Sequence, residues 1–294
     1  MTRRERNRWI ALSALSWLAT LLICAAAPAG GMKGTAGCPA AGHLADMGAS
    51  WCHHWRLCGD RENCIDHVKA RWTLGEPGYS TEAEVIEAVT ECQSGWFMFG
   101  DEWEYQRAIG WYDWTMSAQV DELDWFLNLR DTYNPNCKIA FGGVLAYHPY
   151  TGLRGPGWVR DFAAAYQQRH GTLPPVDAIM MDTYDWPAWR RDYYTDTRAM
   201  VDAIREVYGM DMEVWAREVG CLIGHQCALD STDKLPKIAL LFDRYAFFVS
   251  RDSDWTYTAL WGDGWALTDL GEAYRDMKEY NHRWYLPFYQ QESD

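Results

Sequence analysis

Residues 138–145 read KIAFGGVL, a short and almost wholly apolar run. An amphipathic stretch, Gly157–His170, follows and stops at Gly171, a residue type that commonly ends helices. A second apolar run, Asp177–Met181, comes next. Apolar runs without strict alternation are typical of strands that are buried on both faces. This strand–helix–strand order predicts a parallel sheet covered by helices.

The same alternation continues along the chain and predicts a barrel. The expected strands are Ala45–Trp51, His67–Leu74, Trp96–Gly100, Lys138–Leu145, Asp177–Met181, Met212–Ala216 and Arg244–Ser250. The expected helices are Thr81–Gln93 with a capping-box pattern, Thr115–Tyr133, Gly157–His170, Thr195–Tyr208, Ser231–Asp243 and Leu270–Arg283. Because eight strands close a (β/α)8 TIM barrel, we expect one more before Trp96, between Leu74 and Tyr79. An open doubly wound sheet is the alternative, but no GxGxxG or GxxxxGK(S/T) motif follows any strand.

The N-terminus has the pattern of a secretory signal peptide. Four arginines and one glutamate precede the apolar stretch Trp9–Ala27, and Ala27-Pro28-Ala29 supplies small residues for cleavage. We therefore expect a signal peptide over residues 1–29 and a secreted protein, with an uncleaved membrane anchor as the alternative. Residues 30–44 are expected to be an N-terminal extension, and residues 45–290 a single catalytic domain.

Charge and cysteines agree with export. Loss of the signal peptide takes the formal charge from −14 to −17, which disfavours nucleic acid and polyanionic substrates. Cys24 leaves with that segment, and an even number of cysteines remains, as disulfides in an oxidising compartment require. The pairing is open among 105 connectivities, with Cys221–Cys227 favoured because the two flank a short loop. Zinc is disfavoured because no CxxC occurs and His53, His54 and His67 lack ligand spacing, so no cofactor is expected.

Two glutamates end expected strands in unusual surroundings. Glu102 stands in FGDEW, residues 99–103, and Glu218 in WAREVG, residues 215–220. Catalytic groups of (β/α)8 barrels lie at the C-terminal ends of strands, although a solvated rim residue is the ordinary alternative for either glutamate. Glycoside hydrolysis uses two carboxyl groups, one to protonate the leaving oxygen and one to attack the sugar or activate water. The 18 tryptophans and 17 tyrosines fit this chemistry, because flat rings pack on sugar C–H faces, but they also fit an ordinary core.

The segments Gly100-Asp101-Glu102 and Glu218-Val219-Gly220 resemble the ends of the fourth and seventh strands of clan A (β/α)8 glycoside hydrolases. Over roughly Ala45–Met277 the chain is similar to the "glycosyl hydrolase catalytic core" (Asl-like) family. The similar segments are KIAFGGV at 138–144, the helix at 158–170, VDA at 176–178, DRYA at 243–246 and LTDLGEAY at 267–274. The resemblance implies a retaining enzyme for polysaccharides or oligosaccharides, with Glu102 as acid/base and Glu218 as nucleophile.

The chain departs from this family pattern beside both glutamates. Asp101 replaces the usual Asn, which bonds the sugar 2-hydroxyl, and a carboxylate accepts that bond but cannot donate as an amide does. Asp182-Thr183-Tyr184 stands where many relatives have His-x-Tyr, Trp103 replaces a Pro, and Val219 replaces an aromatic residue. A carbohydrate-binding barrel without activity is therefore a second hypothesis. A metal-dependent hydrolase that uses His53, His54, Asp101 and Asp182 is a third.

Seven further residues are expected to contact the carbohydrate substrate: Asp101, Asp182, Tyr184, Trp261, His53, Trp55 and Trp103. Tyr184 would orient Glu218, and Trp261 would be a sugar platform, with core packing as the alternative for both. Arg217 would keep Glu218 ionised if both faced the cleft, but adjacent residues of a regular strand point to opposite faces. We expect no nucleic-acid partner, and no membrane partner after signal cleavage.

Overall fold

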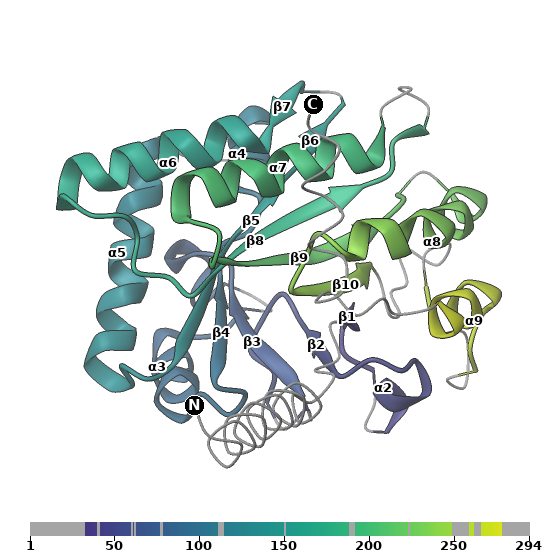
Figure 1. Cartoon of the computed structure of the whole chain (residues 1–294). Helices are drawn as coiled ribbons and strands as arrows, with labels where there is room; N and C mark the ends of the chain where they lie inside the picture. The colour runs from purple at the N-terminus through teal and green to yellow at the C-terminus, as the bar shows by residue number, and fades with distance from the viewer. Residues whose placement is uncertain are drawn as a thin grey trace, which may run out of the picture. The chain divides into compact units, whose positions relative to one another are not determined.

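The computed structural model describes residues 33–39, 42–59, 61, 63–76, 79–110, 115–149, 151–187, 192–222, 224–248, 259–261 and 266–277. Eight strands form a closed barrel in which each neighbouring pair is parallel (Figure 1). They are β1 (Lys33–Ala36), β2 (Trp51–His53), β3 (Cys64–Val68), β4 (Trp96–Phe99), β5 (Lys138–Leu145), β8 (Ala178–Tyr184), β9 (Glu213–Gly220) and β10 (Arg244–Phe248). The predicted (β/α)8 barrel is confirmed, and the expected signal peptide lies outside the described residues.

Helices connect most of the strands. They are α2 (His43–Asp46), α3 (Glu82–Glu91), α4 (Trp103–Ala108), α5 (Met116–Tyr133), α6 (Gly155–His170), α7 (Tyr193–Tyr208), α8 (His225–Ala239) and α9 (Asp269–Asp276). A 3-10 turn, η1 (Arg71–Thr73), and a small hairpin, β6 (Tyr147–His148) with β7 (Leu153–Arg154), complete the elements. Thr81 and Glu84 form the predicted capping box of α3, and Gly171 ends α6. Within the described part of the chain, no helix has the length and apolarity needed to cross a membrane.

The first strand is not where the sequence predicts it. β1 lies in the stretch expected to be an N-terminal extension, and the expected strand Ala45–Trp51 is instead α2 followed by the start of β2. The strand expected between Leu74 and Tyr79 is also wrong, since Gly75 N–H bonds Ser80 O in a turn there. The strand expected over His67–Leu74 starts earlier, at Cys64, and gives way to η1.

Tertiary partners explain why β1 carries no apolar signal. Lys33 is buried because its Nζ donates to the carbonyls of Tyr274 and Arg275 at the end of α9. Gly34 packs so closely on the Trp51 indole that a Cβ there would lie 2.4 Å from Cε2. These contacts bury the strand without any large apolar side chain of its own.

The barrel interior changes from apolar to polar along the strands. Its apolar layer contains Trp51, Ile65, Trp96, Met98 and Trp215 among others, and the Trp96 and Trp215 rings are 4.5 Å apart between centroids. Nearer the C-terminal strand ends, four fully buried polar side chains take over: His53, His67, Asp182 and Arg217. This buried polar layer lies at the end of the barrel where such folds carry their catalytic groups.

Four disulfides join neighbouring parts of the fold. They pair Cys38 with Cys52, Cys58 with Cys64, Cys92 with Cys137, and Cys221 with Cys227. The favoured pair, Cys221–Cys227, is therefore confirmed. Cys92 is the C-cap residue of α3, so its bond ties that helix to the start of β5. Four disulfides fit an oxidising compartment.

Candidate active site

A β-bulge in β9 turns two neighbouring side chains toward the barrel interior. Met181 pairs with Ala216 and the next residue, Asp182, pairs with Glu218, so Arg217 is the extra residue in β9. Ala216 packs in the outer core, and strict alternation would send Glu218 to that side as well. A bulge breaks the alternation and re-aims the following side chain. The expectation that Arg217 and Glu218 point to opposite faces is wrong for this reason.

A second bulge, in β5, makes space for the arginine. Gly142 pairs with Met180, and Val144 pairs with Met181, so Gly143 has no partner of its own. Gly143 has a φ of 79°, and a Cβ on it would lie 2.9 Å from Cζ of Arg217. Only glycine leaves room for the guanidinium at this backbone conformation.

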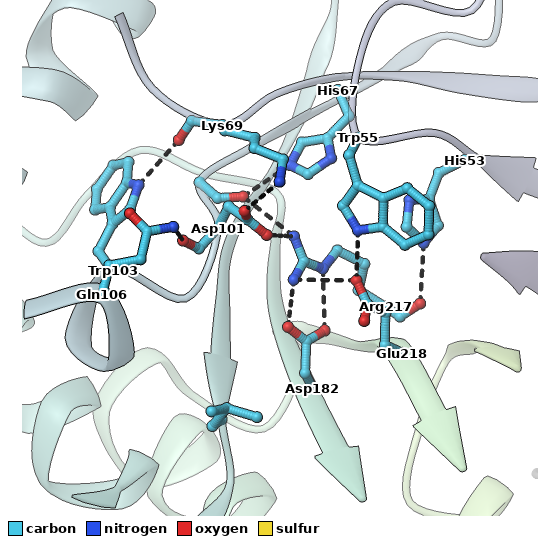
Figure 2. Close-up of polar contacts among 12 residues, drawn as sticks. His53, Trp55, His67, Lys69, Asp101, Trp103, Gln106, Asp182, Arg217 and Glu218 are labelled. Carbon is cyan, nitrogen blue, oxygen red and sulfur yellow. Dashed lines mark hydrogen bonds and ion pairs between the residues drawn. The ribbon is translucent and has the colours of Figure 1, made fainter. Parts of the chain in front are cut away.

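Arg217 forms the centre of a buried ion-pair network (Figure 2). Its Nη1 lies 2.6 Å from Oδ1 of Asp101, and its Nε donates to Oδ1 of Asp182 at 3.0 Å. Nη2 pairs with Oδ2 of Asp182 and lies 3.3 Å from Oε1 of Glu218. The Arg217 side chain is only 1% exposed, so its charge must be balanced by these carboxylates.

Glu218 is surrounded by donors. Trp55 Nε1 donates to Oε1 at 2.7 Å, and the Tyr184 hydroxyl donates to Oε2. Arg217 adds a cation at 3.3 Å. Donors and a cation favour the ionised form of a carboxyl group, so the surroundings of Glu218 suit a nucleophile. Tyr184 makes the contact with Glu218 that was expected from the sequence.

Glu102 has a contrasting environment. It follows β4 in a left-handed conformation, with φ 44° and ψ 38°, and its N–H bonds Gly143 O at 2.9 Å. Among the described residues, none donates a hydrogen bond or an ion pair to its carboxyl group. Burial and the negative charges of Asp182, Asp101 and Glu218 raise the pKa of Glu102 well above its usual range, and Arg217 only partly opposes them. A raised pKa lets Glu102 keep its proton to higher pH than an ordinary glutamate, which suits a general acid.

The two aspartates are occupied by cations. Asp101 pairs with Arg217 through Oδ1 and with Lys69 through Oδ2, at 2.8 Å. Burial opposes ionisation, but Lys69 and Arg217 outweigh it and hold the pKa of Asp101 well below its usual range. Burial raises the pKa of Asp182 to about 7, against the pull of Arg217. The structure thus places both expected substrate-binding aspartates against Arg217.

Two neutral histidines lie in the same layer. Nε2 of His53 donates to Arg217 O at 3.0 Å, and Nε2 of His67 donates to Gly100 O at 2.7 Å. Burial, together with Arg217, lowers the pKa of His53 far below its usual range and that of His67 to about 3. His53 is fully buried, so its side chain does not line the cleft, and its contact with the site is the hydrogen bond to the Arg217 carbonyl.

The residues of the metal hypothesis have other partners. Nε2 of His54 accepts from the Cys38 N–H at 3.2 Å, and Asp101 and Asp182 are bound to Arg217. In the described ranges, the potential metal ligands that meet are Cys38, Cys52 and Cys64. All three sulfurs are in disulfides, so none is a free thiolate ligand.

Two of the expected substrate-binding tryptophans are core residues. Trp103 is 2% exposed, donates to Lys69 O at 2.9 Å, and packs on Phe99 and Phe141. Trp261 is 1% exposed within the outer core. Trp55, by contrast, is half-buried and touches Glu218 directly.

Sequence reasoning did not assign the rings of Tyr105 and His148, which form a chain of contacts with Trp186 and Tyr184. Tyr105 and His148 have ring centroids 4.5 Å apart, His148 lies 5.9 Å from Trp186, and Trp186 lies 6.1 Å from Tyr184. It also missed Lys69, the second cation on Asp101. The available signal was position: Lys69 directly follows β3, and Trp186 comes shortly after the end of β8.

Comparison with known proteins identifies the fold. No protein-family model and no curated protein matches the chain. A GH128 (subgroup II) endo-β-1,3-glucanase from Pseudomonas viridiflava superposes with a TM-score of 0.62 at 16% identity, covering 84% of this chain and 98% of that one. The fold is that of (β/α)8 glycoside hydrolases.

Two further solved structures extend this likeness. A curdlan-specific GH128 (subgroup III) exo-β-1,3-glucanase from Blastomyces gilchristii, in complex with glucose, has a TM-score of 0.61 and 17% identity, and covers 84% of this chain and 99% of its own. A mutant GH128 (subgroup I) endo-β-1,3-glucanase from Amycolatopsis mediterranei, in complex with laminaripentaose, has a TM-score of 0.57 and 16% identity, with the same coverage.

Proposed function

We propose that the protein is a secreted, retaining glycoside hydrolase in which Glu102 is the acid/base and Glu218 the nucleophile. The observation that carries this proposal is the contrast between the two carboxyl groups at the ends of β4 and β9, the fourth and seventh strands of the barrel. Glu218 is held by three donors, one of them a cation, whereas burial and negative neighbours raise the pKa of Glu102. Glycoside hydrolysis needs one carboxyl group that can donate a proton and one that acts as a carboxylate.

The electrostatics also explain how Glu102 would serve in both steps. In the first step Glu102 protonates the glycosidic oxygen while Glu218 attacks the anomeric carbon. The covalent bond removes the negative charge of Glu218, which is one of the charges that raise the pKa of Glu102. Glu102 is then a better base, and it deprotonates the water that hydrolyses the glycosyl-enzyme.

A neutral β-1,3-linked glucan is the substrate that we propose to test first. The half-buried rings of Trp55 and Tyr105 suit the C–H faces of glucose rings. The formal charge of −17 after loss of the expected signal peptide is compatible with a neutral polymer and unfavourable for a polyanion. The three GH128 structures described above are β-1,3-glucanases by name.

Secretion is part of the proposal because two independent features favour it. The N-terminal segment has the arginine-rich start, apolar run and small-residue exit of a signal peptide. The four disulfides suit an oxidising compartment. N-terminal sequencing of the exported protein would show whether it begins near residue 30.

The test is hydrolysis by the purified mature protein of a polysaccharide panel that includes a β-1,3-glucan. Glu102→Gln and Glu218→Gln are each expected to lower kcat by about 10²–10⁴-fold or more, while the exposed Glu206→Gln on α7 is expected to retain wild-type activity. NMR of the first-formed anomer should show retained configuration.

Three outcomes would contradict the proposal. Binding of the glucan without hydrolysis by the wild-type protein would favour the non-catalytic barrel. Inverted product would show that Glu218 activates water instead, and would place the two carboxyls ~6.5–9.5 Å apart where retention needs ~5–5.5 Å. Loss of activity with a chelator would favour the metal-dependent alternative.

A further inference from the structure

We propose that Arg217 is a positioning residue that keeps Glu218 ionised and oriented, and that Asp101 and Asp182 serve to hold Arg217 and not to bind the sugar. The inference rests on the proposed function, because it concerns the nucleophile of that reaction. It also predicts a property of Glu218 that is measurable without any substrate.

Two aspartates that are far apart in the sequence meet at one guanidinium. The side chains come from different strand ends, after β4 and in β8, yet both make ion pairs with Arg217 (Figure 2). Both oxygens of each aspartate are in ion pairs or hydrogen bonds, with Lys69 taking Oδ2 of Asp101. A sugar hydroxyl would have to displace a buried charge-assisted bond to reach either one.

The backbone is shaped to admit Arg217 and to hold it still. The bulge in β9 turns Glu218 to the same side of the strand as Arg217. The bulge in β5 places Gly143 where any Cβ would meet the guanidinium. Bulges commonly re-aim a side chain beside an active site. With 1% exposure, Arg217 has no surface for a sugar, so it acts through Glu218.

Glu218 shares the charge of Arg217 with two aspartates. The ionisable groups near it are Lys69 beyond β3, Asp101 and Glu102 beyond β4, Asp182 in β8, Glu218 beside it in β9, and the histidines His53 of β2 and His67 of β3. Burial lowers the pKa of both histidines and raises that of Glu102. Asp101 has Lys69 as a second cation, whereas Asp182 and Glu218 both depend on Arg217 for their ion pairs. Removing the cation should therefore raise the pKa of Glu218, and removing Asp182 should lower it.

The test compares two variants that differ only in the guanidinium. Asp182→Asn removes one carboxylate and keeps an acceptor for Arg217. The double variant Arg217→Met/Asp182→Asn also removes the cation, and it leaves Asp101 paired with Lys69, so no buried charge loses its only partner. The carboxyl carbons of ¹³C-glutamate-labelled protein are titrated by NMR, and the Glu218 signal is assigned by its loss in Glu218→Gln.

The expected results have opposite signs. The pKa of Glu218 should fall in Asp182→Asn and should rise by about one unit or more in the double variant. On the acid limb of the kcat/KM profile, one unit corresponds to an about tenfold loss at a given pH. KM should change little in Asp182→Asn and in Asp101→Asn, because neither carboxylate binds the sugar. Asp185→Asn is the matched control: Asp185 is equally buried but pairs with Lys234, outside the network.

Each result decides the matter. An unchanged Glu218 pKa in a folded double variant would overturn the inference. If the double variant does not fold, Asp182→Asn alone decides, since an unchanged or raised Glu218 pKa there contradicts the sharing of Arg217. A large rise in KM for Asp101→Asn or Asp182→Asn would return these residues to substrate binding. A wild-type protein without activity would contradict the proposed function. The NMR titration would still test the role of Arg217, because it needs no substrate.

Discussion

Glu102 and Glu218 are the same residue type in the same barrel, but their electrostatic surroundings differ. Trp55, Tyr184 and Arg217 donate to Glu218. Glu102 has burial and negative charge around it. Residue type and strand-end position were enough to single out both glutamates from the sequence, but not to find the neighbours that surround each of them.

A third buried glutamate provides a test at the residue scale that leaves the catalytic pair intact. Glu104 in α4 accepts from Leu145 N–H at 2.7 Å through Oε1, while its buried Oε2 has no partner in the described residues. Burial raises the pKa of Glu104 from 4.5 to about 8. Between these two values the folded protein holds a proton that the unfolded chain releases, so stability falls as pH rises from about 4.5 to 8.

We expect Glu104→Gln to remove this part of the pH dependence. Each unit of pKa difference corresponds to about 1.4 kcal/mol, so the variant should gain stability relative to wild type as pH increases through that range. Urea denaturation at pH 5, 6, 7 and 8 measures the effect, with the exposed Glu206→Gln as a control that keeps the wild-type slope. Identical slopes for wild type and Glu104→Gln would contradict the expectation.

At the scale of elements, the bulges in β5 and β9 decide which side chains of these strands point into the site. Helix ends followed from local signals, as Thr81 with Glu84 and Gly171 show, because those contacts join residues close in sequence. The bulge at Arg217 has no such signal. It is defined by pairing with β8 and β10, which are far away in sequence, so periodicity alone placed Arg217 and Glu218 on opposite faces.

Gly143→Ala tests whether the space left by glycine in the β5 bulge is needed for the Arg217 guanidinium. Gly143 and Gly171 have nearly equal φ values, 79° and 77°, but a Cβ meets Arg217 at the first and nothing within 4 Å at the second. Gly171→Ala therefore reports the backbone strain alone. Gly143→Ala should cost about 1–3 kcal/mol more, because three carboxylates hold the guanidinium in place.

The measurement for this pair is the free energy of unfolding in urea, together with kcat on the active polysaccharide. We expect kcat to fall in Gly143→Ala and to stay unchanged in Gly171→Ala. Equal destabilisation of the two variants would mean that the guanidinium shifts freely, against the rigid network described here.

At the scale of the whole molecule, disulfides constrain chain segments of different length. Cys92 and Cys137 are 45 residues apart in sequence, and Cys58 and Cys64 only 6. In the chain-entropy account, the longer loop loses more freedom in the unfolded state. The double variant Cys92→Ser/Cys137→Ser should therefore lose about 4 kcal/mol, and Cys58→Ser/Cys64→Ser about 2 kcal/mol. Urea denaturation of both measures the order, and a greater loss for the shorter loop would refute it.

Much of this protein follows from the sequence alone. Apolar runs without alternation, separated by capped amphipathic stretches, determine a parallel barrel, because each pattern reflects local burial and backbone geometry. Position at strand ends determined Glu102 and Glu218 as the candidate pair. Cys221 and Cys227 were paired correctly because a short loop brings them together.

Only the tertiary structure decided which partners these residues meet. β1 is buried by Trp51 and the end of α9, which no pattern within Lys33–Ala36 encodes. Arg217 joins Asp101 to Asp182 across more than one strand, because a bulge and a facing glycine leave space for it there. The pKa of a buried group depends on the charges and donors around it in space. Closure of the barrel brings those groups together from distant parts of the sequence.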